Sequence, residues 1–235
     1  MTIAQRLKHY VKRYPLIGPI FWAVSIQYIV IQFIVAGASK SYSYARDAIS
    51  DLGNTACGNF DGHYVCSPLH DLMNASFIIL GGCIMIGSIF LYLRAPKKRP
   101  NTIGFASIAI SGIGMIIVGF SPENLNAWLH ITGAGIAFTA GALSMLILGR
   151  SLQLPKTIKR YALASGSISF LALFALAFID FDSHFPGEGT IERLVVIPQV
   201  LWLIIFGGYI FYKELRRLYA RRSEPRILSE IAHNQ

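Results

Sequence analysis

The chain has 235 residues, of which 54% are hydrophobic and only 14% are charged. An average soluble domain carries about 25% charged residues, so this composition excludes an ordinary soluble enzyme and favours an integral membrane protein. The net charge of +9 is explained below by membrane topology, and we therefore expect no nucleic-acid partner.

The chain order begins with a polar, basic segment, residues 1–15, and six apolar windows follow it. A helix needs roughly 20 mostly apolar residues to cross the hydrocarbon core of a bilayer, and every window approaches or exceeds that length. The windows cover residues 16–38, 69–93, 102–120, 128–148, 161–179 and 194–212. The sequence thus predicts an all-α, polytopic membrane protein with a six-helix bundle at 16–212, one longer outer loop at 39–68 and a basic tail at 213–235.

Lysine and arginine residues alternate between the two sides of the predicted bundle. The terminal segments and the second and fourth connections hold 18 of the 21 basic residues, and only Lys40, Arg46 and Arg193 lie on the other side. The positive-inside rule then places both termini in the cytoplasm of a cell-membrane protein. The opposite, outer side gathers nine acidic residues and four of the six histidines. Because acidic residues contribute little to topology, this gathering indicates a functional surface.

Two cysteines stand in the long outer loop. Cys57 and Cys66 bracket turn-forming glycine, asparagine and aspartate residues, so the segment between them is expected to double back as a hairpin. An oxidising outer face then favours a disulfide between them. Cys83 lies in the middle of a span and is interpreted as a small packing residue.

Two helix starts have the same pattern, Ser67-Pro68 and Ser121-Pro122. Serine as N-cap with proline in the first turn is a common start signal. The first start puts His70 in the first turn of its helix, and the second puts His130 about 12 Å along its helix at 1.5 Å per residue. Small-residue stripes on the same helices predict that both histidines point into the bundle.

The outer-side polar residues define a candidate ligand-binding pocket, because ionisable groups near the membrane are costly and therefore functional by default. Its predicted members are Asp51, His70, Asp71, Asn74, His130, Glu188, Glu192 and Arg193. Within this set, His70, His130, Asp51 and Glu192 are candidate catalytic residues, and the first three are candidate ligands of a divalent metal, although no metal-binding motif is present. The alternative is that these residues only cap helices and pair with one another. His63, His184, Asp61 and Asp182 are expected to be solvated loop residues.

A resemblance to a known family rests on three groups of residues. They are the segment Ile49-Ser50-Asp51-Leu52-Gly53, the segment Cys66-Ser67-Pro68-Leu69-His70 with Met73-Asn74 and Phe77, and Leu129-His130 with Glu192-Arg193. Over roughly residues 16–212 the chain resembles an uncharacterised prokaryotic multi-pass membrane family, catalogued as domain of unknown function 998. That family implies no reaction and no catalytic roles.

The segment Ile49–Gly53 is also similar, more distantly, to the Frag1/DRAM/Sfk1 group of membrane proteins, which is linked with lipid remodelling. This similarity implies membrane lipids as partners. Three functions follow as hypotheses: binding of a lipid head group in the outer pocket, an intramembrane lipid hydrolase or transferase that uses the same pocket with or without a metal, and a structural or assembly protein.

Overall fold

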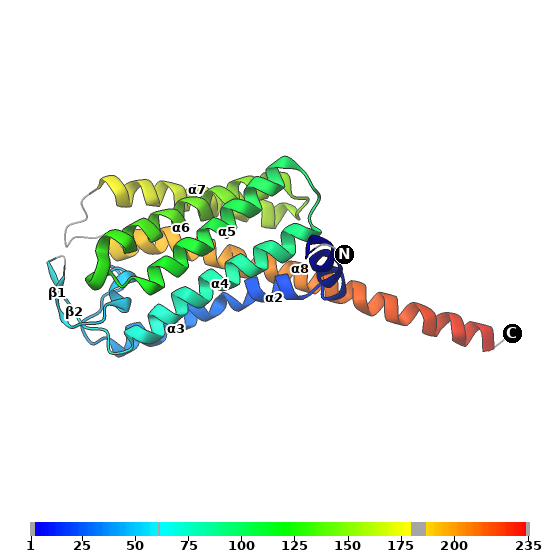
Figure 1. The fold of residues 1–235 in the computed structure, drawn as a ribbon, viewed down its shortest axis with the longest axis horizontal. Helices are drawn as coiled ribbons and strands as arrows, with labels where there is room; N and C mark the ends of the chain where they lie inside the picture. The colour runs from blue at the N-terminus through cyan, green and yellow to red at the C-terminus, as the bar shows by residue number, and fades with distance from the viewer. Residues whose placement is uncertain (1–2, 61, 180–186, 234–235) are drawn as a thin grey trace.

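The computed structural model of the chain describes residues 3–60, 62–179 and 187–233. Its helices are α1 (Ile3–Arg13), α2 (Ile17–Val24), α3 (Ile26–Ala38), α4 (His70–Arg94), α5 (Arg99–Phe120), α6 (Glu123–Ser151), α7 (Lys156–Phe178) and α8 (Glu188–His233). A short 3-10 helix, η1 (Ser50–Gly53), and two strands, β1 (Gly58–Phe60) and β2 (His63–Val65), lie between α3 and α4 (Figure 1).

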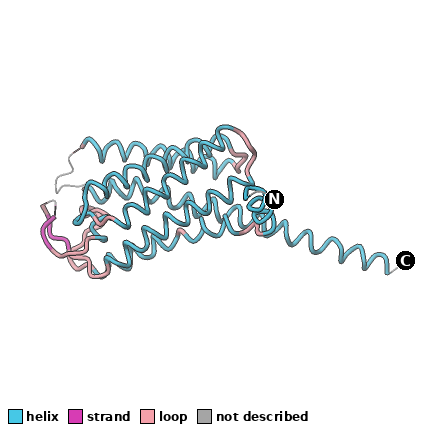
Figure 2. Tube along the Cα trace, viewed as in Figure 1, coloured by secondary structure: helices cyan, strands magenta, loops and turns pink. Residues whose placement is uncertain are grey.

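The six predicted spans are confirmed. Within the described residues six helical segments are long and apolar enough to cross a membrane, the first made of α2 and α3 together and the last ending at Ala220. They run side by side in one bundle (Figure 2). The chain is therefore a multi-pass membrane protein with an all-α fold.

The spans pack in a ring-like order. Helix α5 packs between α4 and α6, α7 packs between α6 and α8, and α8 returns against α2. Close approach depends on small residues: a Cβ added at Gly114 of α5 would lie 2.5 Å from the backbone nitrogen of Ala137 and 2.6 Å from the carbonyl oxygen of Gly133 in α6. The stripe of small residues in the fourth span, which contains Gly133 and Ala137, therefore does face the interior, as predicted.

Aromatic residues join the first span to the last. Trp22 of α2 is fully buried, and its ring lies 5.4 Å from the ring of Trp202 and 5.3 Å from that of Phe206, both in α8. The indole N–H of Trp22 donates to the carbonyl of Ile84 in α4 at 3.2 Å, so its one polar atom is satisfied inside the apolar core.

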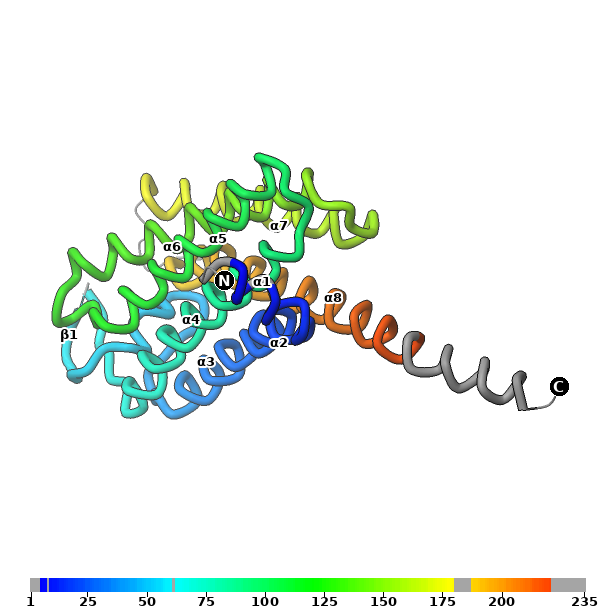
Figure 3. Tube along the Cα trace, turned by 45° about the vertical axis from the view of Figure 1, so that its right-hand side comes forward, coloured from blue at the N-terminus to red at the C-terminus, as the bar shows by residue number. Residues whose placement is uncertain are grey.

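The bundle has two different ends. The hairpin end holds η1, β1 and β2 together with the starts of α4, α6 and α8 (Figure 1). The tail end holds α1 and the α4–α5 and α6–α7 connections, and α8 projects well beyond the bundle from there. Figure 3 shows α1 at this end, beside the start of α2.

The predicted serine caps are wrong. Helix α4 begins at His70 without a side-chain cap, and the Ser67 hydroxyl instead donates to the carbonyl of Leu52 at 2.7 Å. In α6 the backbone leaves the helical region at Asn126, whose side-chain oxygen accepts the N–H of Leu129 at 3.1 Å. Continuous helix thus starts after Asn126, and His130 lies in its first turn rather than about 12 Å along.

Candidate functional site at the hairpin end

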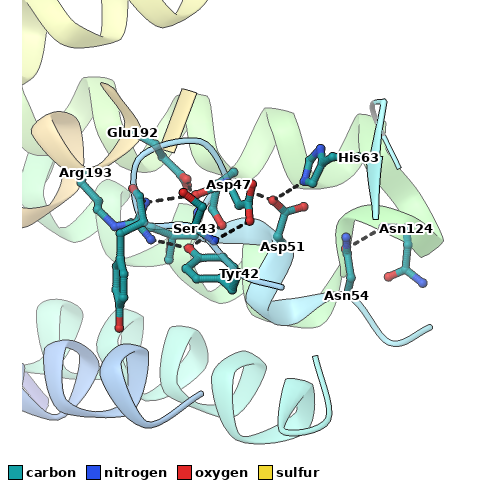
Figure 4. Close-up of polar contacts among 12 residues, drawn as sticks. Tyr42, Ser43, Asp47, Asp51, Asn54, His63, Asn124, Glu192 and Arg193 are labelled. Atoms are coloured by element: carbon teal, nitrogen blue, oxygen red, sulfur yellow. Dashed lines mark hydrogen bonds and ion pairs between the residues drawn. The ribbon is translucent and has the colours of Figure 1, made fainter. Parts of the chain in front are cut away.

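The segment 45–49, just before η1, is docked on the start of α8. The N–H of Gly189 donates to the carbonyl of Arg46 at 3.0 Å, and that of Thr190 donates to the carbonyl of Ala45 at 3.1 Å. The side chain of Glu192, one turn into α8, accepts a short hydrogen bond from the N–H of Ile49 (Figure 4). The orphan N–H groups at a helix start therefore bind a loop from elsewhere in the chain.

Arg193 holds the same segment from a second direction. Its Nη1 donates to the carbonyls of Tyr44 at 2.8 Å and Asp47 at 3.1 Å, and its Nη2 donates to the hydroxyl of Tyr42. The guanidinium also lies over the rings of Tyr42 and Tyr44, at 5.5 and 5.1 Å from their centroids. A planar fork with several donors suits this multiple contact, which a lysine cannot reproduce.

Two buried carboxylates lie beside Arg193 and the segment that it holds. Asp47 is 6% exposed and accepts the N–H of Ser43 at 2.6 Å. Asp51 is 5% exposed, and its Oδ2 accepts the N–H of Ala48 at 2.9 Å and lies 3.1 Å from Nε2 of His63 (Figure 4). Burial raises the pKa of Asp51 to about 6, and the neighbouring His63 limits that rise.

The β1–β2 hairpin supplies His63, which sequence reasoning treated as a solvated residue. The strands pair antiparallel with Phe60 opposite His63, and Gly62 takes a positive φ of 83° at the turn. The predicted disulfide between Cys57 and Cys66 is confirmed and closes the base of the hairpin. The two cysteines were the sequence signal that could have placed His63. A disulfide that joins both ends of the segment folds its middle back over the loop that contains Asp51.

A small cavity separates the hairpin from the loop before η1. Its volume is about 10 Å³, close to what one water molecule needs. It is lined by Ser39, Ser41, Tyr42, Asp47, Asp51, Leu52, Tyr64, Val65, Cys66 and Ser67. We call this space the Asp51 cavity. Two buried aspartates and five residues with hydroxyl side chains thus line a space that only a small polar group enters.

The predicted histidines take positioning roles. Nδ1 of His70 bonds to the carbonyl of Ser67 at 2.9 Å, and Nδ1 of the buried His130 bonds to the carbonyl of Ser121 at 2.8 Å. Each ring thus fastens the turn that precedes its own helix. Asn74 donates to the carbonyl of Gly53 at 2.8 Å and supports η1 from below.

The remaining predicted residues lie at the rim. Asp71 pairs with His70 at 3.4 Å, but its side chain is 96% exposed. Glu188 is exposed in the first turn of α8, where a carboxylate suits the helix dipole. Among the predicted solvated residues, Asp61, Asp182 and His184 lie outside the described residues.

The structure does not assemble the predicted metal ligands Asp51, His70 and His130. In the part of the chain that is described, no three His, Cys, Asp or Glu side chains are grouped closely enough to hold a metal ion. Nδ1 of each histidine bonds to a backbone carbonyl, in the turn at Ser67 for His70 and in the turn at Ser121 for His130. The partner of Asp51 is His63.

A family model described as a protein of unknown function (DUF998) matches residues 17–209, which include the whole hairpin end. The chain belongs to the DUF998 family. No curated protein and no solved structure matches it. The resemblance to DUF998 is therefore confirmed, whereas the distant similarity to the Frag1/DRAM/Sfk1 group stays a prediction.

The disulfide of this DUF998 protein is expected to hold the hairpin over the Asp51 cavity. Replacing Cys57 and Cys66 with serine is expected to lower the free energy of unfolding by about 2–3 kcal/mol, because a closed loop of this length is lost. Chymotrypsin should then cut faster after the exposed Tyr64. The control is Cys83→Ala, which leaves the disulfide intact. Equal cleavage rates in the double variant and the control would contradict this role.

Proposed function

We propose that this DUF998 protein binds the head group of a membrane lipid at the hairpin end, and that the Asp51 cavity receives a primary ammonium group of that lipid. The observation that carries the proposal is the pair of buried carboxylates, Asp47 and Asp51, in the wall of a water-sized cavity. A buried carboxylate is costly unless a cation or several hydrogen bonds compensate it.

The charges around the cavity support a cationic ligand. Glu192 and Arg193 already form hydrogen bonds with other parts of the chain. Glu192 accepts the N–H of Ile49, and Arg193 donates to the carbonyl of Asp47 and to the hydroxyl of Tyr42. Within the described residues, the Asp47 carboxylate accepts one hydrogen bond, from Ser43. Only Oδ2 of Asp51 is bonded, and its Oδ1 accepts no hydrogen bond from the described residues. An ammonium group would bring the three donors that these oxygens lack.

The size of the cavity sets the specificity. The cavity has room for about one water-sized group. A primary ammonium is about that large, whereas a trimethylammonium group carries three additional methyl groups and does not fit. The helix ends that surround the cavity also lie where lipid head groups lie in a bilayer. With the positive-inside rule, the same proposal assigns the lipid to the outer leaflet of the cell membrane.

The remaining predicted residues act in this proposal by position. Ser67 and Asn74 hold the carbonyls of Leu52 and Gly53, on either side of the cavity wall formed by η1. His70 fastens the turn that contains Ser67. In this proposal Asp51 contacts the ligand, Asn74 and His70 help to fix where η1 lies, and the exposed Asp71 and Glu188 take no part.

The test is lipid retention by the purified protein. After exposure to equal amounts of phosphatidylethanolamine, phosphatidylcholine and phosphatidylglycerol, we expect native mass spectrometry to find ethanolamine lipid enriched about tenfold over the other two. Asp51→Asn should abolish this preference. Asp71→Asn is the matched control, because it makes the same change at the same end on a 96% exposed side chain. Equal retention of the three lipids, or the same loss in both variants, would overturn the proposal.

A second candidate function is acid–base chemistry on the bound head group. The Asp51–His63 hydrogen bond favours it, since a carboxylate that orients a half-exposed histidine is a common general-base arrangement. We expect the wild type to convert the ethanolamine lipid slowly and the variant His63→Gln not to convert it. The His63→Gln variant should still retain more ethanolamine lipid than the Asp51→Asn variant does. Unchanged lipid after prolonged incubation with the wild type would remove this candidate.

A further inference from the structure

Helix α1, at the opposite end of the molecule, has two different faces. Leu7, Tyr10 and Val11 of α1, with Tyr14 directly after its end, recur at helical spacing and form an apolar stripe. Arg6 and Arg13 flank this stripe, and Lys12 lies on the opposite side. Only Val11 is buried, at 1% exposure, and the other three apolar side chains are exposed. The bundle thus covers one part of the stripe and leaves the rest bare.

Specific contacts hold α1 against the end of α4. The ring of Tyr10 lies 6.3 Å from that of Phe90, and Nη1 of Arg94 donates to the carbonyl of Val11 at 3.5 Å. Arg94 is itself fixed by Glu214 of α8 at 2.8 Å. The helix is therefore attached to the tail end of the bundle (Figure 3), beside Arg94, the last residue of the candidate membrane span in α4.

The tail end combines aromatic rings with cations. The ammonium of Lys97 lies 3.5 Å from the ring centre of Tyr92, and Arg13 and Arg216 lie over Tyr14 and Tyr212 at 5.6 and 5.8 Å. Aromatic residues and snorkelling basic residues are enriched at the boundary between hydrocarbon and head groups.

Among the side chains that the structure describes at this end, the negative charge is already neutralised. Glu214 is buried and bonded to both Arg94 and Arg217, at 2.8 and 2.9 Å. Among the described side chains of α1 and of the α4–α5 connection, every charged group is basic. The exposed surface is therefore cationic and calls for an anionic partner.

We propose that α1 is an interfacial helix that binds the head groups of anionic phospholipids in the leaflet at the tail end. Its bare apolar side chains enter the boundary of the hydrocarbon, and Arg6, Lys12 and Arg13 meet the lipid phosphates. A lipid surface is the occupant because the exposed apolar and cationic groups lie together at the membrane boundary, where a soluble protein partner would have to displace lipid first.

The test measures which lipids the full chain retains. After exposure to equal amounts of phosphatidylglycerol and phosphatidylcholine, the wild type is expected to retain the anionic lipid preferentially. The triple variant R6Q/K12Q/R13Q should lose at least about tenfold of this preference, since each basic residue near an anionic surface contributes about fivefold. The matched control K156Q/K159Q/R160Q removes the same charge from exposed residues at the same end, outside α1. It should lose clearly less than the α1 variant, because no large apolar side chain at residues 151–161 is exposed to bring these cations down to the lipid.

Two results would overturn the proposal. If both triple variants lost the same part of the preference for anionic lipid, the total positive charge of this end, and not α1 in particular, would attract the lipid. The second result concerns depth: a bimane label on Leu7→Cys, in a Cys83→Ala background, should be quenched by brominated lipid. A label that brominated lipid does not quench would place α1 in water or under a protein partner.

Discussion

Replacing Gly189 with alanine is expected to detach the segment 45–49 from α8 and to lower the free energy of unfolding by about 3 kcal/mol. A Cβ at this position would lie 2.1 Å from the carbonyl oxygen of Asp47 and 2.8 Å from its carbonyl carbon. Backbone cannot yield there without breaking the hydrogen bond from Gly189 to Arg46 and those that Arg193 makes.

Thermal unfolding of the purified protein measures this effect, and lipid retention shows whether the Asp51 cavity survives. The control is Gly208→Ala in the same helix, where an added Cβ meets nothing within 4 Å. Alanine at a helical position is favoured over glycine by about 1 kcal/mol, so the control should unfold at the same temperature or slightly higher. If Gly189→Ala behaved like the control, the docked segment would be contradicted.

Acidification is expected to change lipid binding and stability in opposite directions. Burial raises the pKa of Asp51 from 3.8 to about 6. As the pH falls below about 6, Asp51 gains a proton, loses its charge and releases the ammonium group of the lipid. The folded chain holds this proton more tightly than the unfolded chain, so the free energy of unfolding contributed by Asp51 rises from about pH 6 down to about pH 4.

The measurement compares the wild type with Asp51→Asn at about pH 7.5 and about pH 5. In the wild type, retention of the ethanolamine lipid should fall at the lower pH, while the Asp51 contribution raises the unfolding temperature of the lipid-free protein. Asp51→Asn should lose both changes and keep only the pH dependence of other groups. A variant that kept the wild-type pH response would show that another residue titrates.

The sequence predicts the architecture well because its signals are local. A membrane span is recognised from about 20 consecutive apolar residues. The disulfide is recognised from two cysteines on either side of turn-forming residues. Helix starts were predicted less well. Ser67 and Ser121 have the right neighbours for caps, but the hydroxyl of Ser67 finds a carbonyl of η1, a partner from a different part of the chain.

The candidate site was harder to predict, for the same reason. Asp51, Glu192 and Arg193 stand out as ionisable residues near the membrane, yet their partners are largely backbone groups, and Ile49 and Glu192 are 143 residues apart. Sequence patterns do not reveal such partners. Both histidines expected in the pocket instead bond within their own turns, and His63 reaches Asp51 only because the hairpin folds back.

The hydrogen bond between Ile49 and Glu192 also sets an order for biogenesis. While the ribosome is still making the middle of the protein, the residues that receive segment 45–49 do not yet exist, and Trp22 lacks the aromatic neighbours of α8. The first transmembrane segment can therefore pack against α4 early, but it gains its contacts with α8 only when the final segment is inserted. A nonsense mutation upstream of residue 187 would leave Trp22 and segment 45–49 without these partners, and we expect membrane quality-control proteases to degrade such a product.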